Sequence, residues 1–293
     1  MEIRDTTRIV GLLGYPVSHS LSPAMHNAGF ERLGVDARYV LMPTPPDELA
    51  AAIDKLRDPK YLGANVTLPH KQGAYSLVDE RSGRSEKMGV VNTIVNRGGK
   101  LFGDTTDPVG FLNAFREAGH DFGRKSVAIL GNGGSARTVL FTLAMMAKPR
   151  RILLVARDRE KSLALIEEIR KMTGAKIVEG VGFDEYPASG EGIDIVVNTT
   201  PIGMHPNVDA SPLPAEKLSS GQVVYDIVYN PEETLLLRHA RERGCRTLGG
   251  LGMLVHQGLA SFEAWTGKNP GPAVFLEGIR HHQSARAAAG TIA

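Results

Sequence analysis

Short, continuous runs of apolar residues recur along the chain and alternate with segments of helical periodicity. In the first hundred residues such runs occupy 8–13, 37–42 and 63–68, and helical patterns cover 22–34 and 47–57. A strand that is buried on both faces, as in a parallel sheet, has this continuous apolar character instead of an alternating one. The N-terminal part is therefore predicted to be an α/β layer with a largely parallel sheet.

The alternation of strand and helix resumes after GDTTDP (103–108), where we place a domain boundary. The second domain is predicted to contain strands over 127–130, 151–155, 193–198 and 223–226. Strands and helices at this spacing form the right-handed crossover units of a doubly wound sheet. Only helical patterns follow, over 253–265 and 272–282, so we expect them to pack back on the first domain. The predicted domains are residues 1–107 with 250–293, and residues 108–249, with a hinged cleft between them.

One stretch near the middle of the chain, VAILGNGGSAR (127–137), is a buried strand that leads into a glycine-rich turn and a helix. Glycine permits backbone angles that a Cβ would forbid, and a helix N-terminus offers free N–H groups and a partial positive charge to a phosphate. The stretch predicts a dinucleotide site formed by Gly131, Asn132, Gly133, Gly134, Ser135 and Ala136. Its spacing is G-x-G-G-x-x-R instead of the full G-x-G-x-x-G, so an ordinary strand-to-helix turn is the alternative.

The residues after the second strand of this domain bear on which dinucleotide binds. An acidic side chain there, about 20 residues after the glycines, holds the ribose 2′-hydroxyl of NAD. Here the strand is followed by Ala156 and Arg157, and Lys161 lies in the next helix. A guanidinium can hold a 2′-phosphate through two hydrogen bonds, so the sequence favours NADP. Asp158 would repel such a phosphate, and the alternative is that these cations, with Arg159, are solvated charges at a helix start.

Composition restricts the possible functions. A chain of 293 residues with 42% hydrophobic and 23% charged residues is typical of a soluble globular protein with one large or two ordinary domains. A net charge of +2, without blocks of like charge, argues against a nucleic-acid surface. Cys245 is the only cysteine, which excludes a disulfide within the chain and favours a reducing, cytoplasmic compartment.

Neither a targeting segment nor a metal site is predicted. The N-terminus carries acidic residues and only a short apolar run, unlike a signal peptide, and no apolar stretch approaches the roughly 18 residues of a spanning helix. The nine histidines lack metal-ligand spacing, and the adjacent His281 and His282 are expected to be solvated. The alanine-rich end, SARAAAGTIA (284–293), is expected to fray.

Polar side chains follow the predicted strands of the first domain, at the sheet edge where α/β proteins bind their ligands. They are Ser20, Ser22, Asn65, Thr67, Lys71, Asn92 and Asp107. Taken singly, each has an ordinary explanation: a helix cap for Ser22 and Asp107, a surface charge for Lys71, a hairpin turn for Asn92. Their occurrence together favours a binding site.

Eight motifs of the chain resemble, in order and spacing, those of the shikimate dehydrogenase family. They are SHSLSPAMHN, GANVTLPHK, VVNT, GDTTD, GNGGSAR, NTTPIGM, YDIVYNPEET and GLGMLVHQG, and they span nearly the whole chain. The resemblance implies a substrate domain, made of the N-terminal part and the final helices, and a Rossmann domain. It implies the reversible, NADPH-dependent reduction of 3-dehydroshikimate to shikimate, a step of aromatic amino acid biosynthesis in the chorismate pathway. The expected partners are this substrate and NADP, without nucleic acid, membrane or metal, in a monomer or homodimer.

Carried over residue by residue, the resemblance implies a role for each matching position. Lys71 would be the catalytic group, paired with Asp107. The substrate would be bound by Ser20, Ser22, Thr67, Asn92, Asp107, Tyr229 and Gln257, with Ser20, Ser22 and Tyr229 at its carboxylate. The cofactor would be held by Gly131 to Ala136 at the pyrophosphate, by Ala156, Arg157 and Lys161 at the adenosine end, and by Ile227 and Gly250 at the nicotinamide.

The chemistry explains why a lysine and an aspartate are needed. Hydride arriving at a ketone carbon leaves negative charge on the oxygen, which a positioned cation can stabilise and protonate. Lys71 can do both, while Asp107 would orient its ammonium group.

The chain departs from the family pattern at three places. GDTTDP replaces the commoner GDNTDG, Ala156 stands where asparagine is usual, and Asp158 stands where threonine is common. The last two changes bear on the preference for NADP. Three alternatives stay open: an NAD-preferring quinate/shikimate dehydrogenase, a related reductase for another cyclic substrate, and a nucleotide-sensing module without catalysis.

Overall fold

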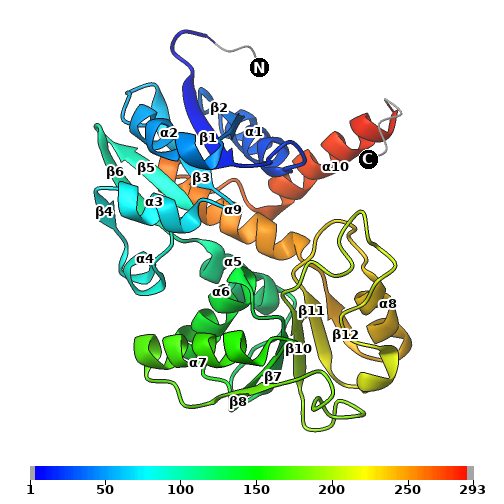
Figure 1. Ribbon diagram of the computed structural model, residues 1–293. Helices are drawn as coiled ribbons and strands as arrows, with labels where there is room; N and C mark the ends of the chain where they lie inside the picture. The colour runs from blue at the N-terminus through cyan, green and yellow to red at the C-terminus, as the bar shows by residue number, and fades with distance from the viewer. Residues whose placement is uncertain (1–3, 289–293) are drawn as a thin grey trace. The chain divides into compact units, whose positions relative to one another are not determined.

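The computed structural model describes residues 4–288, and its contacts divide the chain into two compact units (Figure 1). Unit 1 comprises the residues up to Gly110 and from Val255 onward, and unit 2 comprises Phe111–Leu254. The division falls inside two helices, α5 (Asp107–Glu117) and α9 (Leu251–Thr266). Both units are α/β, as the sequence predicts. The assignment of the substrate to one unit and of the cofactor to the other stays a prediction.

Unit 1 contains a six-stranded mixed sheet in the order β2-β1-β3-β5-β6-β4. Its strands are β1 (Arg8–Gly14), β2 (Ala37–Pro43), β3 (Tyr61–Val66), β4 (Glu80–Arg81), β5 (Thr93–Arg97) and β6 (Lys100–Asp104). β1 is parallel to β2 and β3, whereas β5 is antiparallel to both β3 and β6. β4 is parallel to β6, so three of the five pairs are parallel and the prediction of a largely parallel sheet is confirmed; both antiparallel pairs involve β5, which a tight hairpin turn joins to β6.

The helices of unit 1 include segments from both ends of the described chain. They are α1 (Ser22–Arg32), α2 (Leu49–Lys55), α3 (Lys71–Leu77), α4 (Gly83–Met88), most of α9 and α10 (Pro272–Ala288), with a short 3₁₀ turn at Pro46–Glu48. The pairing of α10 with α1 confirms that the final helices return to the first part of the chain. The expectation that the alanine-rich end frays is wrong up to Ala288, where α10 ends, and residues 289–293 lie outside the described part.

An aromatic cluster forms part of the core of unit 1. His26 of α1 stacks on Tyr39 with ring centroids 4.5 Å apart, and it meets the edges of Trp265 and Phe275 at 5.3 and 5.1 Å. Phe262 packs against the same group. Because these side chains come from α1, β2, α9 and α10, the cluster fixes the C-terminal helices on the N-terminal layer.

Unit 2 contains a six-stranded sheet whose pairs are all parallel, in the order β12-β11-β10-β7-β8-β9. Its strands are β7 (Ser126–Leu130), β8 (Arg151–Val155), β9 (Val178–Val181), β10 (Ile195–Asn198), β11 (Val223–Asp226) and β12 (Arg246–Leu248). The first strand lies in the middle and the order reverses between β7 and β10. This is the doubly wound order of dinucleotide-binding folds, in which the ligand lies beyond the carboxyl ends of the strands at that reversal.

The helices of unit 2 follow β7, β8 and β11, whereas the structure describes no helix between β9 and β10. They are α6 (Gly134–Thr142), which continues as a π-helical turn over Leu143–Ala147, then α7 (Arg159–Thr173) and α8 (Leu235–Glu242), with a 3₁₀ turn at Ala215–Lys217. The core beneath them is built from strand residues that are completely buried, such as Leu130, Val155 and Val196. Continuous burial explains why these strands read as unbroken apolar runs.

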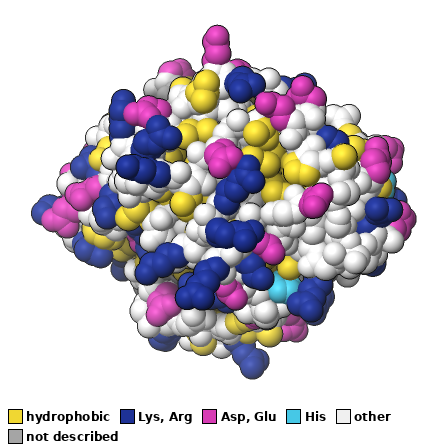
Figure 2. All heavy atoms as spheres, turned by 90° about the horizontal axis from the view of Figure 1, so that it is seen from below, with side chains coloured by type: hydrophobic (Ala, Val, Ile, Leu, Met, Phe, Trp, Pro, Cys, Tyr) yellow, Lys and Arg dark blue, Asp and Glu magenta, His cyan; other side chains and the backbone are white. Residues whose placement is uncertain are grey.

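The distribution of surface charge and the apolar length of the helices are relevant to nucleic-acid and membrane partners. Figure 2 shows one face of the molecule, on which basic and acidic side chains are interspersed. Within residues 4–288, no helix is long and apolar enough to cross a membrane.

Candidate active site

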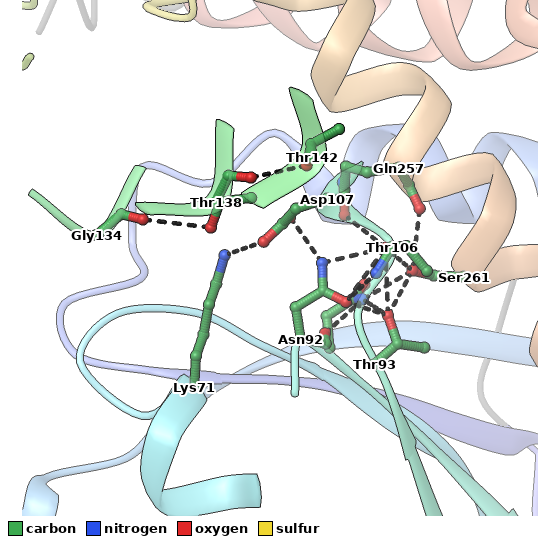
Figure 3. Close-up of polar contacts among 11 residues, drawn as sticks. Lys71, Asn92, Thr93, Thr106, Asp107, Gly134, Thr138, Thr142, Gln257 and Ser261 are labelled. Atoms are coloured by element: carbon green, nitrogen blue, oxygen red, sulfur yellow. Dashed lines mark hydrogen bonds and ion pairs between the residues drawn. The ribbon is translucent and has the colours of Figure 1, made fainter. Parts of the chain in front are cut away.

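Lys71 and Asp107 form an ion pair in unit 1 (Figure 3). Lys71 is the first residue of α3, and Asp107 is the first residue of α5. The ammonium Nζ donates to Asp107 Oδ2 at 2.6 Å. The Lys71 side chain keeps 29% of its surface exposed and the Asp107 side chain 12%, so the cation is the partner that a small molecule can reach. The two residues that the sequence pairs by resemblance are therefore in direct contact.

Asn92 holds the other oxygen of the same carboxylate. Its Nδ2 donates to Asp107 Oδ1 at 2.7 Å, and the side chain is buried. The backbone of Asn92 is fixed on both sides, because its N–H donates to Asp104 and its carbonyl accepts from Val66. Asp107 is thus oriented by one charged and one neutral donor, a charge-assisted arrangement stronger than a pair of neutral hydrogen bonds.

Buried hydroxyl groups surround Asn92, as Figure 3 shows. Thr93, Thr106 and Ser261 are almost fully buried and lie within hydrogen-bond distance of one another. Thr106 also lies 3.5 Å from Gln257 Oε1, a contact at the limit of hydrogen bonding. Gln257 and Ser261 stand one turn apart on α9, so this helix brings the predicted substrate residue Gln257 into the same network.

Asn65 ties the network to β2 and β3. Its Oδ1 accepts from the hydroxyl of Tyr39 at 2.9 Å, and its Nδ2 donates to the carbonyl of Asn92 at 3.0 Å. The side chain also contacts the hydroxyls of Thr93 and Ser261. Asn65 is buried, and both ends of its amide are occupied within the protein. Asn65 therefore holds together the buried side chains that surround Asn92.

The predicted carboxylate-binding serines lie where α1 begins. The N-cap position of α1 is Leu21, without a side-chain cap, so the simple capping explanation for Ser22 is wrong. Ser22 is buried, whereas Ser20 is half-exposed and accepts a hydrogen bond from the backbone N–H of Ser22. Thr67 is half-exposed, and its backbone N–H donates to Leu13.

A cavity of about 410 Å³ opens beside the half-exposed serine. It is lined by Ser18, His19, Ser20, Pro23, Ala24, Leu41, His282 and Arg286. The cavity therefore contains a guanidinium together with a serine that is predicted to bind a carboxylate. Arg286 was not expected from the sequence, because the helix carrying it was predicted to end near residue 282. His281 and His282 are exposed, as expected.

The glycine-rich turn in unit 2 has the geometry of an anion site. Gly131 has φ = +101°, and a Cβ there would lie 2.8 Å from Thr200 Cγ2, so a side chain would be both strained and crowded. Asn132 Nδ2 donates to the carbonyl of Asp158 and to Ser162 Oγ, at 2.9 and 3.0 Å. Gly133 is the N-cap of α6, and no side-chain cap among residues 4–288 bonds to the N–H groups there, so they can bind a phosphate.

The other residues of the predicted pyrophosphate loop differ in exposure. Gly133, Gly134 and Ser135 are exposed at the start of α6. Ala136 is completely buried, so its side chain packs in the core.

The predicted adenosine site lies at the end of β8 and the start of α7. Arg157 and Lys161 are exposed, whereas the side chain of Ala156 is buried. Asp158 is the N-cap of α7, and its Oδ1 accepts from the backbone N–H of Lys161 at 2.9 Å. Asp158 therefore has a local structural task, and Arg159 forms an ion pair with Glu185. All three cations of this segment are exposed, and within residues 4–288 only Arg159 among them has an ion-pair partner.

The predicted nicotinamide residues lie where β11 and β12 end. A Cβ on Gly250 would lie 2.1 Å from the carbonyl oxygen of Ile227, so only glycine permits this close approach. The N–H of Gly250 donates to the carbonyl of Val228. Tyr229 follows on the same loop and is 36% exposed. It belongs to unit 2, and its predicted contact with the substrate stays a prediction.

A metal centre has no support in the part of the chain that the structure describes. Residues 4–288 contain no group of three or more histidine, cysteine or acidic side chains that could hold a metal ion.

The chain matches known proteins over nearly its whole length. Residues 12–94 match the model of the shikimate dehydrogenase substrate binding domain, and residues 250–277 match that of the shikimate 5′-dehydrogenase C-terminal domain. The NADP⁺-dependent shikimate dehydrogenase of Methanocaldococcus jannaschii is 41% identical over 281 residues, which are 94% of this chain and 98% of that protein.

Solved structures are similar as well. A crystal structure of a shikimate dehydrogenase in complex with NADP⁺ has a TM-score of 0.90 at 38% identity and covers 96% of this chain and 97% of its own. Quinate dehydrogenase from Corynebacterium glutamicum, in complex with NAD, has a TM-score of 0.87 at 30% identity and covers 94% and 99%. On the identity and coverage of these relatives, the chain belongs to the shikimate dehydrogenase family.

Proposed function

We propose that the chain catalyses the reversible reduction of 3-dehydroshikimate to shikimate by NADPH, with Lys71 and Asp107 as its acid–base pair. The observation that carries the proposal is the 2.6 Å ion pair between Lys71 Nζ and Asp107 Oδ2, whose carboxylate Asn92 also holds. Family membership supports the reaction and the cofactor.

In this proposal, different residues of the chain orient the reacting groups and transfer the proton. NADPH supplies the hydride when it is bound. Lys71 hydrogen-bonds the substrate oxygen that gains negative charge and gives it a proton, because an ammonium is both a cation and a donor. Asp107 and Asn92 orient that ammonium and the neighbouring ring hydroxyl. In the reverse direction the neutral amine of Lys71 accepts the hydroxyl proton.

The carboxylate of the substrate is proposed to bind at Ser20 and Ser22. Ser20 lines the cavity, which supports its access to a ligand, whereas Ser22 is not among the residues that line it. Thr67 and Gln257 are proposed to bind the ring hydroxyls, and Tyr229 is proposed to bind at the carboxylate.

Arg157 is proposed to hold the 2′-phosphate of NADP, with Lys161 beside it. Replacing Arg157 with alanine is expected to weaken NADPH about tenfold or more while NADH is little affected, because a charge-assisted hydrogen bond to the phosphate is lost. Fluorescence titration of both cofactors measures this. Arg159→Ala is the matched control, since Arg159 is paired with Glu185. Equal losses for NADPH and NADH in Arg157→Ala would show that Arg157 does not bind the 2′-phosphate.

Asp158 is expected to limit the affinity for NADP. Its carboxylate caps α7 beside Arg157, so replacing it with serine keeps an N-cap oxygen and removes the negative charge. Asp158→Ser is expected to tighten NADPH several-fold at low ionic strength, and the gain should fade as salt is added. Glu160→Gln removes a neighbouring acidic charge and serves as the comparison. No change in the NADPH to NADH ratio would mean that the phosphate lies away from Asp158.

The main alternative is an NAD-preferring quinate/shikimate dehydrogenase, which the similarity to the C. glutamicum enzyme keeps open. Turnover of shikimate and quinate, each with NADP⁺ and with NAD⁺, decides between the two. The proposed function predicts the highest kcat/KM for shikimate with NADP⁺. A higher value for quinate with NAD⁺ would favour the alternative, and tight NADPH binding without turnover would favour a sensing module.

We further propose a cytoplasmic location and a monomeric or homodimeric state, without a nucleic-acid partner. The single cysteine, Cys245, supports the location, because a chain without a disulfide of its own is typical of a reducing compartment. Sedimentation of the purified protein measures the oligomeric state.

A further inference from the structure

The hydroxyl group of Thr93 has no part in the roles proposed above, although it lies at the centre of the buried network. Thr93 is fully buried at the start of β5. Its Oγ1 lies 2.8 Å from Asn92 Oδ1, 2.8 Å from Ser261 Oγ and 3.2 Å from Asn65 Nδ2. A fourth contact joins Thr93 Oγ1 to Thr106 Oγ1 at 3.4 Å, so the hydroxyl has more neighbours than the one hydrogen bond it can donate and the two it can accept.

The partners of Thr93 fix the direction in which its hydroxyl donates. Asn65 Nδ2 can only donate, and Asn92 Oδ1 can only accept. Thr93 Oγ1 therefore donates to Asn92 Oδ1 and accepts from Asn65 Nδ2. Its contacts with the hydroxyls of Ser261 and Thr106 have no fixed direction. On the far side of the same amide, Asn92 Nδ2 donates to Asp107. Thr93 therefore donates to the Asn92 amide, and this amide in turn donates to the Asp107 carboxylate. In such a chain of hydrogen bonds, each bond polarises the next.

The orientation of the Asn92 amide decides whether the Asp107 carboxylate faces the NH₂ group or the oxygen of that amide. Asn92 Oδ1 accepts from Thr93 Oγ1 and from the backbone N–H of Thr106, both at 2.8 Å. A flipped amide would bring its NH₂ group against that N–H and its oxygen against the Asp107 carboxylate, and both contacts would be repulsive. The Thr93 hydroxyl adds a second donor on the side where the oxygen must lie.

We propose that Thr93 is a positioning residue whose hydroxyl holds the Asn92 amide so that Nδ2 meets Asp107, which aligns Asp107 with Lys71. The inference rests on the proposed acid–base role of that pair. Thr93 itself is too deeply buried to reach a substrate, so its effect on the reaction passes through Asn92.

Two substitutions of Thr93 and one control distinguish the effect of its hydroxyl from the effect of its packing. Thr93→Val keeps the shape and removes the hydroxyl, whereas Thr93→Ser keeps the hydroxyl and removes a buried methyl group. Thr105→Val is the matched control, because Thr105 is also completely buried and its Oγ1 has no hydrogen-bond partner among the described residues. The measurements are kcat and KM for shikimate with NADP⁺, the affinity for NADPH, and the melting temperature of each variant.

Thr93→Val is expected to lower kcat about tenfold, the effect of one lost hydrogen bond to a group that must be held in place, with unchanged NADPH affinity. Thr93→Ser is expected to keep the wild-type kcat and to melt at a lower temperature, because it leaves a small cavity. Thr105→Val is expected to keep the wild-type kcat. Wild-type kcat in Thr93→Val, or equal losses in all three variants, would overturn the proposal. Absence of shikimate turnover in the wild-type protein would instead contradict the proposed function.

Discussion

Replacing Lys71 with alanine is expected to lower kcat for shikimate oxidation by roughly 10²–10⁴-fold, the usual contribution of a general acid–base group. The variant should still bind NADPH, because the proposed cofactor residues are the glycine turn and Arg157 of unit 2. Lys71→Arg restores the positive charge, yet a guanidinium does not release its proton, so it should stay slow. Steady-state kinetics and cofactor titration together measure both effects.

The control for Lys71 is another lysine of unit 1. Lys87 lies exposed near the end of α4, and Lys87→Ala should leave kcat unchanged. Removing the partner carboxylate by Asp107→Asn should lower kcat with little change in NADPH affinity. Lys71 would keep its positive charge but lose the carboxylate that orients its ammonium group. Near-normal turnover of purified Lys71→Ala would contradict the proposed mechanism, whatever the behaviour of the Asp107 variant.

The doubly wound sheet could be predicted because its strands carry their own signal. β7, β8, β10 and β11 are central and buried on both faces, so their apolar runs are unbroken. The strands β4, β9 and β12 lie at the edges of their sheets, have two to four residues and contain few apolar ones. Such a strand is defined by the neighbour it pairs with, and this neighbour is not visible in the local sequence.

The residues of the candidate site also differ in whether the sequence alone could predict them. Lys71, Asn92 and Asp107 could be predicted, because they lie in motifs whose residue order is distinctive. Ser261 could not, because a serine one turn after Gln257 has many ordinary explanations and its partners Asn65 and Thr93 lie 196 and 168 positions away. Only the packing of α9 against β3 and β5 brings these side chains together.

Acid should destabilise unit 1 through His26. The ring is fully buried among aromatic side chains, and neither nitrogen has a hydrogen-bond partner among the described residues. Burial therefore lowers the pKa of His26 from 6.5 to about 3 in the folded protein. The unfolded chain takes up a proton near pH 6.5 and the folded protein does not, so this stability is complete above pH 6.5 and is lost as pH falls toward 3.

Replacing His26 with phenylalanine should remove this acid sensitivity. Between pH 7 and pH 5 the wild-type protein is expected to lose about 2 kcal/mol more of its free energy of unfolding than the variant, since one pKa unit corresponds to about 1.4 kcal/mol. The fluorescence of Trp265, the only tryptophan, reports on this cluster during urea unfolding, because its ring lies 5.3 Å from His26. His26→Leu is the second variant, should the larger ring pack poorly, and the exposed His281→Gln is the control.

The comparison between variants matters because another buried group has the opposite dependence on pH. Burial raises the pKa of Asp226 in unit 2 from 3.8 to about 6. Its contribution is therefore present below pH 3.8 and is lost as pH rises through 6, so the two groups partly cancel between pH 4 and 6. Asp226 is the same in wild-type protein and in His26→Phe, and the difference between their unfolding free energies contains only the histidine. If that difference is the same at pH 5 and pH 7, the ring of His26 takes up a proton in the folded state and the interpretation of the aromatic cluster as dry is wrong.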